Sequence, residues 1–126
     1  MENIRSIKPY VGIAVVDDKN LEIIKEITAG LEEEGVPWEL RKFVDWDAVI
    51  LACNSAAESI LQVGIGVGKN GDAAVHYARL PFTEPLFFIS YSDGNQDLWR
   101  ILGSNAARLI KGMPFRQIGQ EKQKLE

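Results

Sequence analysis

The chain has 126 residues, a usual size for one domain, and its 46% of apolar residues is enough for a core that needs neither a disulfide nor a metal. The 18 acidic and 14 basic residues give a formal net charge of −4, without the basic stripe expected of a duplex nucleic-acid binder. The first apolar run is too short for a signal peptide or a membrane span, so we expect a cytoplasmic protein with no nucleic-acid and no membrane partner.

The first half of the chain predicts alternating strands and helices. Short runs rich in valine and isoleucine indicate strands buried on both faces, and apolar residues at a spacing of three and four indicate helices. The expected elements are a strand at residues 10–16, a helix at 20–34, a strand at 38–44 and a helix at 46–59. Gly35 and Pro37 end the first helix, while Asp45 precedes the second and Asp47 lies in its first turn.

The second half predicts a hairpin, a further strand and a last helix. Asn70-Gly71 favours a type I′ turn, in which both central residues have positive φ. The expected elements are strands at residues 62–68, 72–78 and 86–91, and a helix from 95 to about 111 that Gly112 and Pro114 end. The apolar stripe of that helix is expected at Leu98, Ile101, Leu102, Ala106, Leu109 and Ile110.

This order predicts one α/β domain over residues 1–126, with its core at about residues 10–116. Strand–helix–strand connections imply parallel pairing, and the hairpin at residues 62–78 adds one antiparallel strand. We therefore expect a mixed five-stranded sheet, mostly parallel, between helices. The polar residues 1–8 are expected to form a loose arm, and the charged tail from residue 119 is expected to be disordered.

The residues that carry reactive or metal-binding groups are scattered. Cys53 lies in an apolar stretch and is interpreted as a small core residue. His76 has no Asp or Cys at metal-ligand spacing nearby, so a structural or interface role is favoured. Asp17 and Asp18 follow the first strand, where they either cap the next helix, which is favoured, or hold Mg²⁺.

Three glycines, Gly64, Gly66 and Gly68, alternate along the third predicted strand. A dinucleotide-binding loop needs GxGxxG between a strand and a helix, whereas these glycines lie within a strand that leads into a turn. Their placement favours close packing of a helix on the sheet over nucleotide binding.

Two further segments have unusual compositions for their positions. Glu32, Glu33 and Glu34 end a predicted helix, where the helix dipole prefers cations. A solvated face is the favoured interpretation, and a glutamate kept for a partner or a cation is the alternative. Ser104 and Asn105 follow a glycine inside the last helix, which costs stability unless something packs or bonds there. The segment is therefore a candidate contact surface, and the residues alone favour an interaction module over an enzyme.

Three blocks of sequence resemble a known family. The blocks are GLEEEGVPWEL at residues 30–40, QVGIGVG with AAVHYARLP at 62–81, and GSNAARLIKGMPFR at 103–116. They resemble the small subunit of diol and glycerol dehydratase reactivating factors, which is similar to the medium subunit of the dehydratase. Each block is modestly specific, and their order and spacing together are much more so.

The resemblance implies a three-layer α/β/α sandwich of the anticodon-binding-domain-like type. It also implies a partner, a large chaperone-like ATPase subunit that binds ATP or ADP with Mg²⁺, in a heterotetramer. That factor releases damaged cobalamin from an inactivated coenzyme-B12-dependent dehydratase. The small subunit is then non-catalytic, binds no cofactor by itself, and is located in the cytoplasm or at a bacterial microcompartment.

One residue role follows from the resemblance by position. The middle glutamate of the EEEG motif, Glu33, is expected to reach the metal that accompanies the large subunit's nucleotide. The expected interface consists of Glu32, Glu33, Glu34, Ser104, Asn105 and Arg108. Two alternatives stay open: the dehydratase medium subunit itself, which is usually longer, and a stand-alone Rossmann-like nucleotide binder. The sequence does not decide between glycerol and propanediol dehydratase as the target.

Overall fold

Strands and helices alternate through the first half of the protein, as the apolar spacing predicts. The computed structural model describes residues 9–16 and 20–117. Its elements are β1 (Val11–Val16), α2 (Leu21–Glu33), β2 (Trp38–Phe43), α3 (Ala48–Glu58), β3 (Val63–Val67), β4 (Ala73–Tyr77), β5 (Phe87–Ile89), a short 3₁₀ helix (Tyr91–Asp93) and α4 (Gln96–Lys111). The predicted arm and tail, and Asp17 with Asp18, lie outside the described residues.

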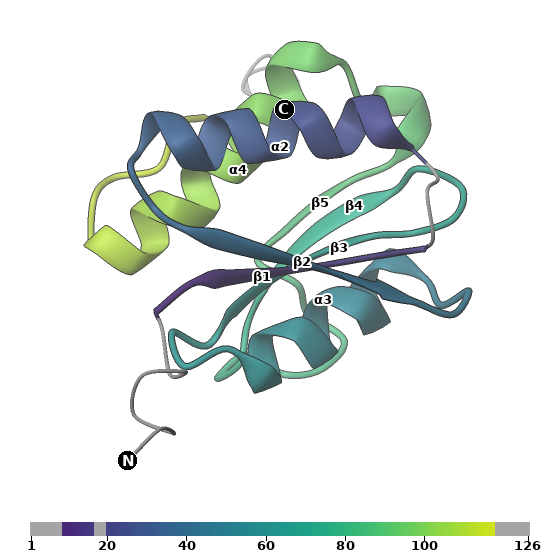
Figure 1. Ribbon diagram of the computed structural model, residues 1–126, viewed down its shortest axis with the longest axis horizontal. Coiled ribbons are helices and arrows are strands. Elements are labelled where there is room, and N and C mark those ends of the chain that lie inside the picture. The colour runs from purple at the N-terminus through teal and green to yellow at the C-terminus, as the bar shows by residue number, and fades with distance from the viewer. Residues whose placement is uncertain (1–8, 17–19, 118–126) are drawn as a thin grey trace, which may run out of the picture.

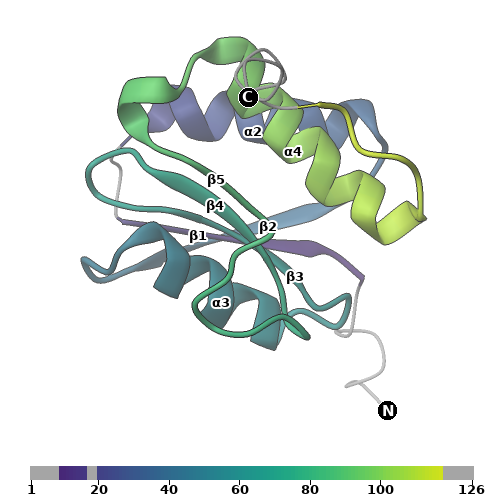
Figure 2. The same cartoon turned by 180° about the vertical axis from the view of Figure 1, so that it is seen from behind.

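The strands form one five-stranded sheet in the order β2-β1-β3-β4-β5. β1 pairs in parallel with β2 and β3, whereas β4 is antiparallel to both of its neighbours, β3 and β5. β4 therefore runs against the other four strands, and the predicted mixed sheet with one antiparallel strand is confirmed. Helices α2 and α4 lie on one face of this sheet and α3 lies on the other (Figures 1 and 2).

Alternate positions of the central strands differ in size, although nearly all are buried. Odd-numbered residues of β1 and β3, such as Ile13 and Ile65, are large and join the main core with α2 and α4. Even-numbered residues on the opposite face are small, as at Gly12, Gly64 and Gly66. A sheet covered on both faces needs apolar or small residues at every position, which explains the unbroken apolar runs.

The small face of the sheet brings α3 into backbone contact with β3. A Cβ atom on Gly66 would lie 2.3 Å from the Ala48 carbonyl oxygen, and one on Gly64 would lie 2.2 Å from the Ala56 nitrogen. Any side chain here would push the helix away from the sheet. The alternating glycines thus serve helix packing, as expected from their place within a strand.

A second backbone contact joins α2 to α4 on the other face of the sheet. A Cβ atom on Gly30 would lie 2.1 Å from the Arg100 carbonyl oxygen, and one on Gly103 would lie 2.0 Å from the Ile27 carbonyl oxygen. The glycine inside α4 is therefore explained by a contact within the chain. Most of the predicted apolar stripe of α4 is confirmed, since Leu102 and Ala106 are buried and Leu98, Leu109 and Ile110 pack against the core. The buried face also includes residues outside that stripe, namely Trp99, Gly103, Ser104, Asn105 and Ala107.

Three local predictions are wrong in detail. Helix α3 begins at Ala48 rather than at residue 46, so Asp47 is its N-cap instead of lying in its first turn, and the Asp47 side chain accepts a hydrogen bond from the Ile50 nitrogen at 2.9 Å. The β3–β4 hairpin is present, but positive φ occurs at Gly71 (94°) and not at Asn70. The bonds from the Gly71 nitrogen to the Gly68 carbonyl and from the Gly68 nitrogen to the Asp72 carbonyl instead define a longer loop with a glycine bulge. Cys53 is partly exposed on α3 rather than buried in the core.

The end of α2 agrees with the sequence. Gly35 has φ +74° and follows the C-cap residue Glu34. The Gly35 nitrogen donates to the Glu32 carbonyl at 3.0 Å, and the Val36 nitrogen donates to the Leu31 carbonyl at 3.2 Å. This pair of bonds is a Schellman motif, which fixes the direction in which the chain leaves the helix. Among the described residues, the helices are too short or too polar to cross a membrane.

The contact between α2 and α4 can be tested with Gly103→Ala. In an open helix this change would stabilise by about 1 kcal/mol, but the new Cβ atom meets the Ile27 backbone at 2.0 Å. We expect a net loss of about 1–3 kcal/mol in the free energy of unfolding, measured by urea denaturation.

Gly35→Ala is the control for that variant, because no atom lies within 4 Å of the Cβ position and the cost comes from the backbone angle alone. That cost is about 1 kcal/mol. A stabilised Gly103→Ala protein would show that the two helix backbones are not in contact.

Candidate functional site

The acidic turn, defined as residues Glu32 to Gly35, lies where α2 meets the second half of α4. Its three glutamates have different environments. Glu32 and Glu33 are exposed, whereas the Glu34 side chain is only 11% exposed. In the sequence these residues form one acidic run, but in the structure the Glu34 carboxylate is largely buried, while Glu32 and Glu33 face solvent.

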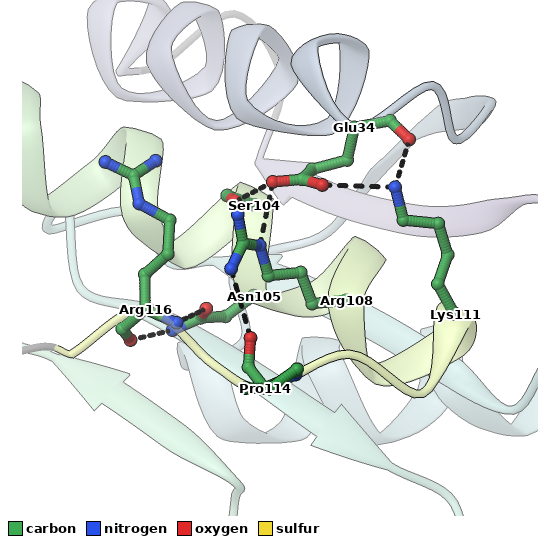
Figure 3. Close-up of polar contacts among 7 residues, drawn as sticks. All are labelled: Glu34, Ser104, Asn105, Arg108, Lys111, Pro114 and Arg116. Atoms are coloured by element: carbon green, nitrogen blue, oxygen red, sulfur yellow. Dashed lines mark hydrogen bonds and ion pairs between the residues drawn. The ribbon is translucent and has the colours of Figure 1, made fainter.

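Glu34 is held by three side chains of α4 (Figure 3). Its Oε2 atom accepts hydrogen bonds from the Ser104 hydroxyl at 2.6 Å and from Arg108 Nε at 2.9 Å. Its Oε1 atom accepts a bond from Lys111 Nζ at 3.1 Å. Both oxygens are therefore engaged, and the solvated-face interpretation of the acidic run is wrong for Glu34.

The cluster of α4 side chains around Glu34 explains why an acidic residue is tolerated at the C-terminal end of α2. Lys111 Nζ also donates to the Glu34 backbone carbonyl at 2.7 Å, so a cation from α4 lies at the negative end of α2. The hydrogen bond from Ser104, and then that from Arg108, lowers the pKa of Glu34 from 4.5 to about 2, although burial acts in the opposite direction. Glu34 is thus a fixed anion that ties the ends of two helices together.

Glu33 and Glu32 make weaker contacts on the exposed side of the acidic turn. Glu33 Oε2 lies 3.3 Å from Arg100 Nη1, and the Glu33 side chain is 48% exposed. Glu32 Oε2 accepts a hydrogen bond from Trp38 Nε1 at 3.3 Å. Glu32 and Glu33 are therefore both carboxylates that a partner can reach without breaking the Glu34 cluster.

Ser104 and Asn105 are fully buried and bonded within the chain. The Asn105 amide nitrogen donates to the Arg116 carbonyl at 2.7 Å, and the Arg116 nitrogen donates to the Asn105 amide oxygen at 2.6 Å. Arg108 Nη1 donates to the Pro114 carbonyl at 3.1 Å, which adds a further link (Figure 3). These bonds hold residues 113–117, called the strap here, against α4.

The structure therefore changes the interpretation of the 103–105 segment. The polar residues inside α4 are explained by bonds to Glu34 and to the strap, so they organise this region from within. Direct contact of Ser104 or Asn105 with another protein would require these internal bonds to open. Exposed atoms for a contact come instead from Glu32 and Glu33, with Arg108 partly exposed beside them.

The other candidate residues lie away from the acidic turn. His76 is 1% exposed on β4, its Nδ1 atom has no partner in the described structure, and burial lowers its pKa. The interpretation of His76 as a structural residue agrees with this burial. Within residues 9–16 and 20–117, no three His, Cys, Asp or Glu side chains are placed to hold a metal together.

Comparison with known proteins gives the family. Residues 8–116 match the family described as dehydratase medium subunit. The chain is 38% identical, over 90% of its length and 88% of the relative's, to the diol dehydratase-reactivating factor small subunit of Klebsiella michiganensis. It is also 38% identical, over 87% of its length and 92% of the relative's, to the propanediol dehydratase-reactivating factor small subunit of Salmonella typhimurium.

Solved structures agree with the sequence comparison. A glycerol dehydratase reactivase chain matches with a TM-score of 0.82 and 33% identity, over 87% of this chain and 98% of that chain. The chain belongs to the dehydratase medium subunit family, among the reactivating-factor small subunits. A chain of a diol dehydratase-reactivating factor complexed with ADP and Mg²⁺ matches with a TM-score of 0.80 and 37% identity, over 87% of this chain and 99% of that chain.

Sequence reasoning missed several residues that build the acidic turn. Arg100 and Lys111 were not recognised as partners of the glutamates, and Arg116 was not linked to Asn105. A signal did exist for the first two, because basic residues recur along one side of α4 at helical spacing after an unexplained acidic run. The two bonds between Asn105 and Arg116 join the Asn105 side-chain amide to the backbone of Arg116, so the Arg116 side chain gives no signal of them.

The fixed charge of Glu34 predicts a pH-dependent stability. The folded pKa, about 2, lies below the ordinary value of 4.5, so the stabilisation is fully present above pH 4.5 and is lost as the pH falls toward 2. We expect Glu34→Gln to unfold more easily than the parent protein by on the order of 2 kcal/mol at pH 7. Urea denaturation between pH 7 and pH 2.5 should show this difference shrinking with acid.

Glu33→Gln is the matched control, since it removes the same charge one residue away from a carboxylate that is 48% exposed. Its effect should stay below about 1 kcal/mol. Equal effects of the two substitutions at pH 7 would contradict the assignment of Glu34 as the held carboxylate.

Proposed function

We propose that this chain is the non-catalytic small subunit of a two-subunit reactivating factor. Its partner is a large ATPase subunit that carries ATP or ADP with Mg²⁺, and the isolated chain binds no cofactor. The assembly, a heterotetramer, releases damaged cobalamin from an inactivated coenzyme-B12-dependent diol or glycerol dehydratase. The observation that carries this proposal is similarity to such small subunits over nearly the whole length of both chains.

The acidic turn is the part of the small subunit that we assign to the partner's nucleotide site. Mg²⁺ prefers carboxylate oxygens and keeps several waters, so a single glutamate from a neighbouring subunit is enough to complete its shell. Glu33 fits that requirement, because its side chain is 48% exposed and, within the part of the chain that the structure describes, its carboxylate contacts Arg100 at 3.3 Å. Glu34 does not fit it, since both of its oxygens are already bound by α4.

The interface that we propose is narrower than the set expected from the sequence. Glu32 and Glu33 contact the large subunit directly. Glu34 and Ser104 hold the turn in place from within, while Asn105 and Arg108 hold the strap beside it. Buried polar networks of this kind fix one conformation when every member has a partner.

The alternatives that the sequence left open are less well supported. The chain covers 98% and 99% of two solved reactivase chains, which supports a small subunit over the longer dehydratase medium subunit. A stand-alone nucleotide binder is disfavoured, because the backbone of α3 occupies the space beside Gly64 and Gly66. With helices on both faces of the sheet, we also assign the three-layer, anticodon-binding-like sandwich. A cytoplasmic location, with association with a microcompartment, completes the proposal.

The role of Glu33 can be tested by reconstituting the complex. We expect Glu33→Ala to leave the isolated chain folded, because an exposed ion pair contributes about 0–1 kcal/mol. The same change should weaken binding to the ADP-loaded large subunit by roughly tenfold or more in the presence of Mg²⁺, as expected when a metal ligand is lost. Titration calorimetry with the purified subunits measures both affinities.

Glu22→Ala is the matched control, since it removes an exposed acid from the first turn of the same helix. It should leave the affinity unchanged. Binding by the Glu33→Ala protein at the parent affinity would remove Glu33 from the interface, and ATP hydrolysis by the isolated chain would contradict its non-catalytic role.

A further inference from the structure

Arg100 joins two glutamates of α2 that lie two helical turns apart. Its Nε and Nη2 atoms donate to Glu26 Oε1 at 3.1 and 2.8 Å. Its remaining nitrogen, Nη1, donates to Glu33 Oε2 at 3.3 Å. Two of the three guanidinium nitrogens thus anchor the side chain at Glu26, and the third is directed at Glu33.

The backbones of the two helices determine this placement. Gly30 lies between Glu26 and Glu33 on the same side of α2, and its missing side chain allows the Arg100 carbonyl to approach. A Cβ atom on Gly30 would lie 2.1 Å from that carbonyl oxygen. The Arg100 side chain therefore starts directly opposite the gap between the two glutamates, and it spans that gap.

Arg100 interacts more strongly with Glu26 than with Glu33. Glu26 is 12% exposed and Arg100 is 44% exposed, so the anchoring pair is partly shielded from water. The hydrogen bonds from Arg100 to Glu26 are the largest cause of a raised pKa of Arg100, and Glu33 contributes less. Glu26 is therefore the main partner of the guanidinium, and Glu33 is a secondary partner whose carboxylate is restricted by a single longer contact with it.

We propose that Arg100 is a positioning residue for Glu33. Anchored by Glu26, its guanidinium orients the Glu33 carboxylate, so that the carboxylate is presented to a divalent cation carried by another protein. This inference rests on the proposed contact of Glu33 with the Mg²⁺ of the large subunit. Restricting a long, flexible side chain before binding reduces the entropy lost when the complex forms.

The test compares the affinity of the reconstituted, ADP-loaded complex in Mg²⁺ with that in EDTA. We expect Arg100→Gln to lower the Mg²⁺-dependent gain in affinity by about three- to tenfold, the range set by the entropy of ordering one glutamate side chain. The affinity in EDTA should not change. Glu26→Gln should cause a similar loss, because the released guanidinium then pairs fully with Glu33 and competes with the cation.

Arg100→Lys is the conservative variant. The lysine ammonium keeps the positive charge and can reach one of the two carboxylates, but it lacks the planar guanidinium that engages both. We therefore expect Arg100→Lys to keep more of the Mg²⁺-dependent gain in affinity than Arg100→Gln does, but less than the parent protein. Circular dichroism and the melting temperature of each isolated variant provide the control for folding.

Three results would overturn the proposal. If Arg100→Gln weakens binding equally in Mg²⁺ and in EDTA, Arg100 contacts the partner or supports the fold and does not position Glu33. If Arg100→Gln increases the gain from Mg²⁺, the guanidinium competes with the cation. If a Glu33→Gln protein keeps the full Mg²⁺-dependent gain in affinity, Glu33 does not bind the cation. In that case the proposed role of Glu33 is wrong, and the inference about Arg100 is wrong with it.

Discussion

The backbone contact between α2 and α4 is the constraint on which the rest of the acidic turn depends. Gly30 and Gly103 remove the side chains that would otherwise separate the two helices, and each faces a carbonyl oxygen of the opposite helix. Basic side chains of α4 therefore lie beside the glutamates of α2. Without this approach, the acidic run would be a solvated helix end with an unfavourable dipole interaction.

The approach of the helices gives neighbouring glutamates separate roles. Glu34 is held through both oxygens, and it links the end of α2 to Ser104 and Lys111 (Figure 3). Glu33 lies one residue earlier, and its carboxylate accepts a longer hydrogen bond from Arg100 at 3.3 Å. A carboxylate that is held through both oxygens thus lies next to one that is 48% exposed. Glu34 fixes the backbone at the end of α2, and the Glu33 carboxylate stays accessible.

Much of the fold could be predicted from the sequence, because its signals are local. Apolar runs located the central strands, Gly35 located the end of α2, and the Asn-Gly pair located the β3–β4 hairpin. The type of that turn was not predictable, since a bulge at Gly71 depends on how the two strands twist together. The apolar stripe of α4 was largely predictable, because Leu102 and Ala106 are buried in the core and Leu98, Leu109 and Ile110 pack against it. The burial of Gly103, Ser104 and Asn105 was not predictable, because small and polar residues give no hydrophobic signal.

The site could be predicted only in part. The resemblance to reactivating-factor small subunits singled out Glu33, but the partners of each glutamate come from residues about 70 positions later in the chain. Such pairings depend on the tertiary contact between the helices, which no spacing within one element encodes. Ser104 and Asn105 were correctly recognised as unusual for a helix interior, yet their partners proved to be internal.

The most direct measurement of the central claim is affinity purification of the tagged chain from its native host, followed by mass spectrometry and a cobalamin assay. The account predicts a large ATPase subunit in stoichiometric amount, ATP hydrolysis by the purified complex and no bound cobalamin. Recovery of a catalytic dehydratase subunit with stoichiometric cobalamin would contradict it, and would identify the chain as a dehydratase medium subunit.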